Sequence, residues 1–166
     1  MREKMEQVEI DRIAKTFFAL FLEQSALPDI AARCCKLGRS ILISDIDENP
    51  SYWLVPAACN QRLVGFIRLG LEGKLMAYGR FGQGPQLSDL PLLSFLSEEV
   101  AGREIRRSFG SDYGELTPPK LVHDGPVDRI TWLSRGRSGD GKKVLLFWSF
   151  GTTYLRTEPV QRSSSS

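Results

Sequence analysis

The stretch RLVGFIRLGLEGKLMAYGRF, residues 62–81, decides how this chain folds. Two runs of strand-forming residues flank Glu72-Gly73, and a glycine in such a break supplies the positive φ that a tight hairpin turn needs. Gly65 and Gly79 lie inside the runs, where glycine marks a bulge or the close approach of another group. The pattern predicts a pair of antiparallel strands over residues 62–70 and 74–81.

More strands are predicted on both sides of this hairpin. YWLVPAA, residues 52–58, precedes it by a short turn and extends it to a three-stranded meander. Pro56 lies within that run and predicts an edge strand or a bulge, because proline lacks an amide donor. Asp140-Gly141 is a strong hairpin signal near the C-terminus. The strands expected there cover residues 130–136, 142–150 and 152–156.

Helical spacing of apolar residues appears in two longer segments. Residues 5–24 carry a broad apolar stripe opposite charged positions. Residues 91–108 show the same pattern after Ser88 or Asp89 as N-cap. A short second helix is predicted over residues 30–37, and residues 40–46 fit either a strand or a connection. Residues 109–128, rich in Gly, Pro and Asp, are expected to form a long surface connection. Its length is unusual for a compact domain and slightly favours a place beside a site.

These elements predict an α+β fold with N-terminal helices, an antiparallel β-meander, a second long helix and C-terminal antiparallel strands. The order is compatible with cystatin-like and with profilin- or PAS-like architectures, a likeness that transfers neither residues nor activity. A length of 166 residues favours one domain. That domain is expected over residues 1–158, with a disordered tail over residues 159–166.

Composition and charge narrow the classes of partner and compartment. The formal net charge is +2, from 22 basic and 20 acidic residues, which is too small to favour nucleic acid or an anionic membrane. No apolar run approaches the roughly 20 residues that a membrane span needs. The N-terminus mixes acidic and basic residues and does not resemble a secretion signal. We therefore expect a cytoplasmic protein without a membrane partner.

The cysteines and acidic residues do not form a metal motif. Cys34, Cys35 and Cys59 are an odd set with two chain neighbours, a poor disulfide framework, and we expect reduced thiols. Asp45 to Asn49 resembles the opening of a calcium loop, but Pro50 stands where that loop needs glycine. Neither a metal nor a cofactor is expected.

Two further motifs are weak. Gly82-Gln83-Gly84-Pro85 precedes a helix but lacks the spacing of a phosphate-binding loop, so an ordinary turn is expected. Basic residues gather around the last hairpin near Tyr154, an arrangement that can bind single-stranded nucleic acid. Their number is low and no ribonucleoprotein motif accompanies them, so nucleic acid is disfavoured. The basic residues are Arg135, Arg137, Lys142 and Lys143.

The feature with most functional content is that two strands are apolar on both faces. In residues 62–69, Ile67 and Leu69 lie on one face and Phe66 on the other; in residues 144–150 both faces are apolar. Such a sheet must be covered on both sides, and we expect a helix or a second subunit on the second face. This favours a non-enzymatic binding or assembly module that self-associates, as a homodimer or with a protein partner, through an apolar sheet face.

The alternative is a small-molecule-binding protein or an enzyme with a pocket between the sheet and the helices. Its candidate ligand-binding residues are Cys59, His123 and Asp124, because His123 is the single histidine that a nucleophile could use as a base. Convergence of two of these side chains in one concavity would favour this hypothesis. No motif for a catalytic residue is present, which argues against an enzyme.

Overall fold

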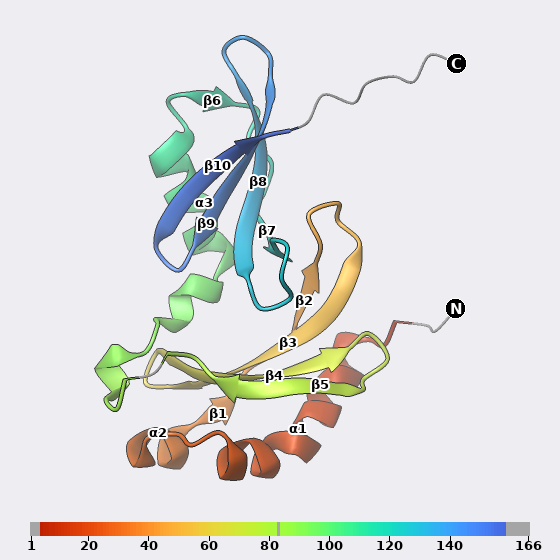
Figure 1. Cartoon of the computed structure of the whole chain (residues 1–166), viewed down its shortest axis with the longest axis vertical. Coiled ribbons are helices and arrows are strands. Elements are labelled where there is room, and N and C mark those ends of the chain that lie inside the picture. Colours follow the sequence, from red (N-terminus) through yellow and green to blue (C-terminus); the bar gives the residue numbers. More distant parts are fainter. Residues whose placement is uncertain (1–3, 83, 159–166) are drawn as a thin grey trace.

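The computed structural model describes residues 4–82 and 84–158, and these form an α+β fold in two halves (Figure 1). Residues 4–82 make the N-terminal half, in which helices lie against a meander, as the sequence predicts. Its elements are α1 (Gln7–Gln24), α2 (Asp29–Cys34), β1 (Lys36–Leu37), β2 (Ile41–Ser44), β3 (Pro50–Cys59), β4 (Arg62–Gly70) and β5 (Leu75–Arg80).

Residues 84–158 make the C-terminal half, in which one helix packs on a set of mainly antiparallel strands. The hairpin predicted at Asp140-Gly141 is confirmed, with a φ of +85° at Gly141. The elements are the 3-10 turns η1 (Leu87–Asp89) and η2 (Leu93–Leu96), the helix α3 (Glu98–Phe109), and the strands β6 (Tyr113–Gly114), β7 (Lys120–His123), β8 (Ile130–Ser138), β9 (Lys143–Ser149) and β10 (Thr152–Thr157).

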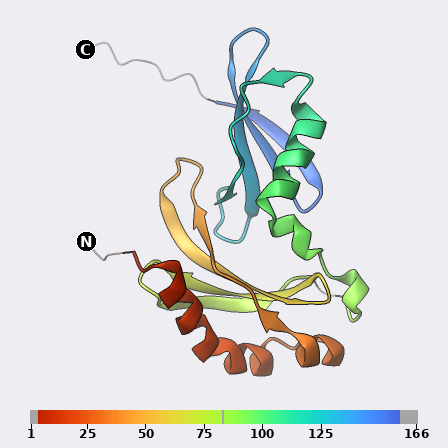
Figure 2. The ribbon, with the colours of Figure 1, turned by 180° about the vertical axis from the view of Figure 1, so that it is seen from behind.

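One twisted sheet runs through both halves. Within the described residues its strand order is β10-β9-β8-β7-β2-β3-β4-β5, with β1 beside β3 and β6 beside β8. The halves meet where β2 and β7 pair in parallel at Ser44 and Val122. Figures 1 and 2 show α1 and α2 against the sheet of the N-terminal half, and α3 against that of the C-terminal half.

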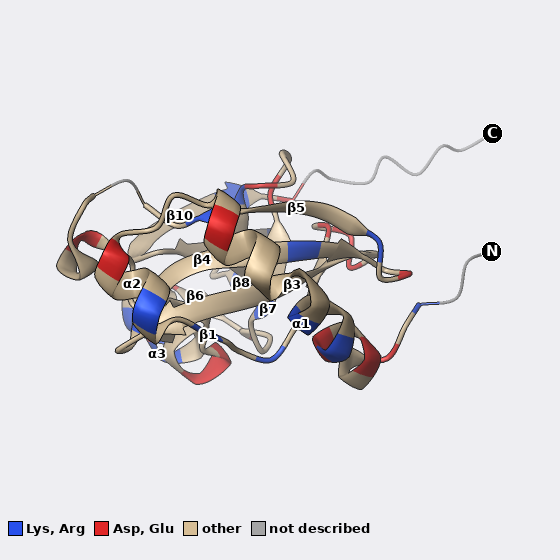
Figure 3. Ribbon diagram, turned by 90° about the horizontal axis from the view of Figure 1, so that it is seen from below, with Lys and Arg blue, Asp and Glu red and all other residues tan. Residues whose placement is uncertain are grey.

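The helices pack on opposite faces of this sheet, and β3 takes part in both cores. Its side chains alternate between the faces, as a strand requires. Trp53 and Val55 pack in the core beneath α1, whereas Tyr52 and Leu54 pack in the core that includes Ile105 of α3. The charged positions of α1 lie away from its buried stripe (Figure 3), whose centre is Ile10, Ala14 and Phe21.

The hairpin of residues 62–81 forms as predicted, and the chain itself covers its second face. Gly73 has a φ of +86° in the turn between β4 and β5. Ile67 faces the core beneath α1. On the other face, the guanidinium of Arg68 lies 5.0 Å from the Tyr52 ring and 3.5 Å from the carboxylate of Asp128, just before β8. The expected helix or second subunit is therefore replaced here by the C-terminal half.

A row of aromatic rings completes this contact between the halves. Phe66 of β4 lies 5.4 Å from Phe81, which lies 6.1 Å from Phe150 in the turn between β9 and β10. Phe150 then packs edge-on against Phe95 of η2 at 5.8 Å. All four rings are partly buried. The row joins strands that are far apart in sequence, so no local pattern predicts it.

The second long helix begins later than residue 91. Its N-cap is Ser97, whose hydroxyl accepts from the Val100 amide at 3.4 Å. The preceding segment is bound to the start of β4: the Leu63 amide donates to the Pro91 carbonyl at 2.7 Å, and the Leu93 amide to the Gln61 carbonyl at 2.8 Å. These long-range hydrogen bonds outweigh the helical pattern between residues 91 and 97.

Three further expectations require correction or qualification. Residues 109–128 are not only a connection, because they contain β6 and β7, which pair with β8. Pro56 lies in a central strand, not at an edge, and a bulge follows it at Ala57. Its carbonyl accepts a hydrogen bond at 2.8 Å from the amide of Gly38, a residue that lies between β1 and β2. The tail at residues 159–166 lies outside the described residues.

Candidate functional site

Asp124 lies at the centre of a polar cluster on the face of the C-terminal strands opposite α3. We call this the α3-distal face; its apolar floor is Val122, Leu133, Leu145 and Phe147. Asp124 is 5% exposed, accepts from the Tyr154 hydroxyl at 2.9 Å and forms an ion pair with Arg156. The Tyr154 ring stacks on the Phe147 ring with 4.5 Å between centroids. The Arg156 guanidinium also lies over the Phe147 ring, 4.8 Å from its centroid. A plane of aromatic and guanidinium groups thus covers the floor.

The environment of Asp124 keeps its carboxyl ionised. Burial by itself raises the pKa of this group, but hydrogen bonds from Arg156 and Tyr154 lower it, together with the charges of Arg156 and Arg129. The net result is an Asp124 pKa below its ordinary value. Burial raises the pKa of Tyr154, so its phenol remains a hydrogen-bond donor. These contacts of Tyr154 and Arg156 with Asp124 hold β10 in place.

We expect Asp124 to contribute stability that depends on pH. Its depressed folded pKa gives a contribution present above the unfolded pKa of about 3.9 and lost as pH falls through the folded pKa. Asp124→Asn is expected to lower the free energy of unfolding by about 1–3 kcal/mol at neutral pH, because the buried partner of Arg156 loses its charge. Thermal unfolding between pH 3 and 7 measures both effects. Asp112→Asn, at an exposed position, is the control, and equal pH profiles for wild type and Asp124→Asn would contradict the expectation.

A hollow of about 1170 Å³ adjoins this cluster. Arg135 and Glu158, which both line it, form an ion pair, and Arg135 donates to the Ile46 carbonyl at 2.6 Å. The basic residues that the sequence placed around the last hairpin are therefore partly neutralised within the protein. The charged residues lining the hollow are Asp47, Arg135, Asp140, Lys142, Lys143, Arg156 and Glu158.

His123 lies on the other side of β7 and contacts a serine. Its Nε2 is 3.0 Å from the Ser51 hydroxyl, and its Nδ1 is 3.2 Å from the Gly125 carbonyl oxygen. Consecutive residues of an extended chain point to opposite faces, so Asp124 cannot orient His123. Where a catalytic triad has a carboxylate beside the histidine, His123 has the backbone carbonyl of Gly125. Neither Ser51 nor His123 lines the hollow or the groove described below.

Cys59 forms a disulfide with Cys34, and the expectation of reduced thiols is wrong. Packing of α2 against the end of β3 brings the two Cα atoms to 5.4 Å, a normal disulfide separation, although 25 residues separate them in sequence. Cys35 is the free cysteine; burial raises the pKa of its thiol to about 11.

The three candidate residues occupy separate places. His123 contacts the beginning of β3 at Ser51, and Cys59 lies eight residues further along that strand, about 26 Å away. His123 and Asp124 are chain neighbours on opposite faces. The structure therefore brings no two of these side chains together in one of the two concavities described.

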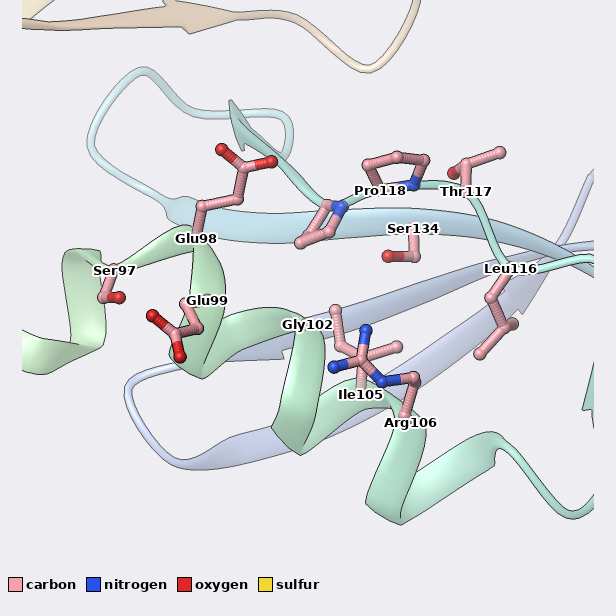
Figure 4. A pocket seen from close by; sticks show the side chains of 11 residues that line it. Ser97, Glu98, Glu99, Gly102, Ile105, Arg106, Leu116, Thr117, Pro118 and Ser134 are labelled. Atoms are coloured by element: carbon pink, nitrogen blue, oxygen red, sulfur yellow. The ribbon is translucent and has the colours of Figure 1, made fainter.

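A second concavity lies between α3 and the chain segment at residues 116–119 (Figure 4). Its volume is about 690 Å³, within the range typical of small-molecule sites. Ser134 of β8 lies at its floor with 1% exposure, and Leu116 and Ile105 supply apolar wall. Glu99 and Arg106 of α3 border it. We call this concavity the α3 groove.

Sequence reasoning missed the residues of the α3 groove. Gly102 was the available signal, because glycine inside a helical pattern costs about 1 kcal/mol relative to alanine and needs a reason. Ser134 gave no signal, since a serine in a strand reads as an ordinary solvent-facing residue. The groove depends on the segment at residues 116–119, whose position against α3 is set by long-range pairing with β8.

Within residues 4–82 and 84–158, no three His, Cys, Asp or Glu side chains gather as a metal site requires. No helix in this part of the chain has the length and apolar character to cross a membrane.

The chain was compared with protein-family models, with curated proteins and with solved structures. None of the three comparisons gives a match. The fold and any function therefore rest on the contacts of this chain alone.

Proposed function

We propose that the protein is a non-enzymatic assembly module whose copies pair through the edge strand β10. The observation that carries the proposal is a self-complementary row of side chains on this strand. β10 is the last strand of the sheet, and Thr152, Thr153, Leu155, Arg156 and Thr157 on it are exposed. An open edge of strand-forming residues is a template for another chain.

The backbone groups that β10 leaves available follow from its turn. Phe150 and Gly151 have φ of +46° and +89°, as in the type I′ turns that close two-residue hairpins. Ser149 and Thr152 are therefore a hydrogen-bonded pair, and the Glu158 amide donates to the Lys143 carbonyl at 3.0 Å. Even-numbered residues of β10 thus bond to β9, and the outward amides and carbonyls belong to Thr153, Leu155 and Thr157.

Antiparallel pairing of two copies about a two-fold axis at Leu155 uses all of these outward groups. Leu155, which is 45% exposed, then lies opposite itself. Thr153 lies opposite Thr157, and Tyr154 opposite Arg156, each pair occurring twice. Apolar, Thr–Thr and cation–aromatic cross-strand pairs are all favourable. A register centred on Tyr154 uses fewer outward groups and sets Leu155 against threonine.

The other edge of the sheet is less suited to pairing. β5 pairs with β4 through a register shift beside Leu69, and such irregularities protect edges. Lys74 and Arg80 flank its ends, which adds like charge in any antiparallel pairing of two copies. Met76, 49% exposed on this strand, provides a matched control position.

Sedimentation velocity over a concentration series tests the proposal. Wild type is expected to shift from monomer to dimer, whereas Thr153→Pro and Leu155→Lys are expected to remain monomeric. Proline at residue 153 removes an outward amide and leaves the bonds to β9 intact, and lysine at residue 155 sets two like charges opposite each other.

Met76→Lys is the control and is expected to dimerise like wild type. Circular dichroism verifies that each variant is folded. A wild-type monomer at all concentrations would overturn the proposal, as would dimerisation that both β10 variants leave unchanged.

A further inference from the structure

Cys35, the free cysteine, stands directly opposite Cys59 in the sheet. Lys36, the first residue of β1, pairs with Ala58 in an antiparallel register. One step back along this register, Cys35 faces Cys59, and its backbone already has the extended conformation of a strand. Directly opposite residues of antiparallel strands direct their side chains to the same face. Both cysteines accordingly belong to the core beneath α1, and both are buried.

The hydrogen bonds between β1 and β3 show which kind of cross-strand pair this is. The Gly38 amide donates to the Pro56 carbonyl at 2.8 Å, which makes these two residues a hydrogen-bonded pair. Hydrogen-bonded and non-hydrogen-bonded pairs alternate along antiparallel strands. Cys35 and Cys59, three positions away, are therefore a non-hydrogen-bonded pair. The Cα atoms of such pairs lie about 4.5 Å apart, within the range that a disulfide spans.

The sulfur of Cys59 thus has two cysteines within reach. It is bonded to Cys34, the last residue of α2, which approaches from the helix and not along the strand. A bond to Cys35 would close a loop one residue shorter, so both bonds restrict the unfolded chain to nearly the same extent. They differ in their effect on α2. The bond to Cys34 tethers this helix of 6 residues to β3, whereas a bond to Cys35 leaves the helix untethered.

We propose that the three cysteines form an exchange unit, in which the disulfide moves from Cys34–Cys59 to Cys35–Cys59. Cys35 loses its proton and its sulfur attacks the sulfur of Cys59. The bond from Cys59 to Cys34 breaks, and Cys34 leaves as a thiolate that takes up a proton. One disulfide and one thiol are present before and after, so the step needs neither oxidant nor reductant.

The exchange has two consequences for the N-terminal half. A buried thiol at Cys35 is replaced by a thiol at the partly exposed Cys34, which alkylating reagents and small disulfides can reach. The helix α2 also loses its covalent link to β3, while β1 stays linked to that strand. The exchange unit is independent of pairing through β10.

Cys34→Ser tests whether the second bond fits the native fold. Oxidised glutathione is expected to close a Cys35–Cys59 disulfide in this variant, identified by mass spectrometry of non-reduced peptides. Its melting temperature is expected to rise by several degrees over that of the reduced variant. Cys35→Ala, which can form only the Cys34–Cys59 bond, is the matched control. Two free thiols in folded Cys34→Ser, under conditions that close the bond of Cys35→Ala, would overturn the proposal.

Amide hydrogen exchange measures the release of α2. Its amides are expected to exchange faster in oxidised Cys34→Ser than in oxidised Cys35→Ala, because only the Cys34–Cys59 bond includes the last residue of the helix. The Ala32 amide, which donates to the Pro28 carbonyl at 3.0 Å, reports on the first turn. Equal protection of α2 in the two oxidised variants would contradict its release.

Iodoacetamide trapping tests the exchange in the wild type. Incubation of the oxidised protein without reductant is expected to label Cys34 and to leave a Cys35–Cys59 bond, whereas Cys35→Ala stays unlabelled. The rate is expected to rise about tenfold per pH unit between about pH 7 and 9.5, because the attack needs the Cys35 thiolate and the pKa of this thiol is about 11. Label on Cys35, no more label on Cys34 than in Cys35→Ala, or a rate that rises with protein concentration would each count against exchange within one chain.

Discussion

Loss of the Cys34–Cys59 disulfide is expected to lower the free energy of unfolding by about 3.5 kcal/mol, with a melting temperature about 7–14 °C lower. The bond closes a loop across 25 residues that includes β1, β2 and β3. Removing it gives the unfolded chain the freedom that this loop restricts. The bond also holds α2, a helix of 6 residues that is too short to be stable alone, against the end of β3.

Thermal unfolding of Cys59→Ser and of the reduced wild type measures the effect. Cys35→Ala is the control and is expected to lower the melting temperature less than Cys59→Ser does, because Cys35 takes no part in the bond. Iodoacetamide is expected to leave Cys35 unmodified in the oxidised native protein, since the thiol is buried and its pKa is about 11. Identical melting temperatures with and without reductant would contradict the expected role of the disulfide.

Gly65→Ala is expected to destabilise the protein by about 3 kcal/mol. A Cβ at residue 65 would lie 2.4 Å from the carbonyl oxygen of Gly79 and 2.6 Å from the ring of Phe21. The first contact is with the backbone of β5, which cannot rotate away. Phe21 is fully buried and lies in the core beneath α1, so its ring has little space to move. The methyl group must therefore shift β5, α1 or both.

Gly79→Ala on the neighbouring strand is the matched control. Its Cβ would meet nothing closer than the Phe66 ring at 3.4 Å, and we expect a change below about 1 kcal/mol. Chemical denaturation of the two variants provides the comparison. If both substitutions destabilise the protein equally, the cost comes from losing any glycine of the hairpin. The close approach of Phe21 to Gly65 would then not be its cause.

Local patterns predicted most of the fold. Glu72-Gly73 and Asp140-Gly141 identified two hairpins because a turn with positive φ depends on a few adjacent residues. The apolar stripe of α1 likewise depends on spacing within one helix. Gly65 was expected to mark close approach, and the contact with Phe21 confirms it. The two hairpins and the apolar stripe depend on residues that are close in sequence, whereas the contact between Gly65 and Phe21 joins residues that are far apart.

Features that depend on distant residues were missed. β7 has 4 residues and no pattern of its own, and it exists because β8 and β2 flank it. The start of α3 moved because Leu63 and Gln61 bind the segment before it. Adjacent Cys34 and Cys35 obscured a bond to a third cysteine that only the fold brings near. The cytoplasmic location stays a prediction.

The candidate site could be predicted only in part. The ligand-binding role predicted for Asp124 stays a prediction; its side chain bonds to residues on β10 and beside β8, on the face away from His123. Alternation along a strand separates neighbours that look like a pair in sequence. Ser134 takes its place at the floor of the α3 groove only in the fold, and the exposed Arg106 borders that groove beside Gly102. Neither property is written in local sequence.

The alternating side chains of β3 make the two halves depend on each other for folding. Tyr52 and Leu54 belong to one core and Trp53 and Val55 to the other, so neither core can be completed while β3 is out of place. Detaching the strand for one half would expose apolar side chains of both to water. The chain is therefore built to unfold as one cooperative unit, and the loss of stability from a substitution at one end is shared by the whole protein.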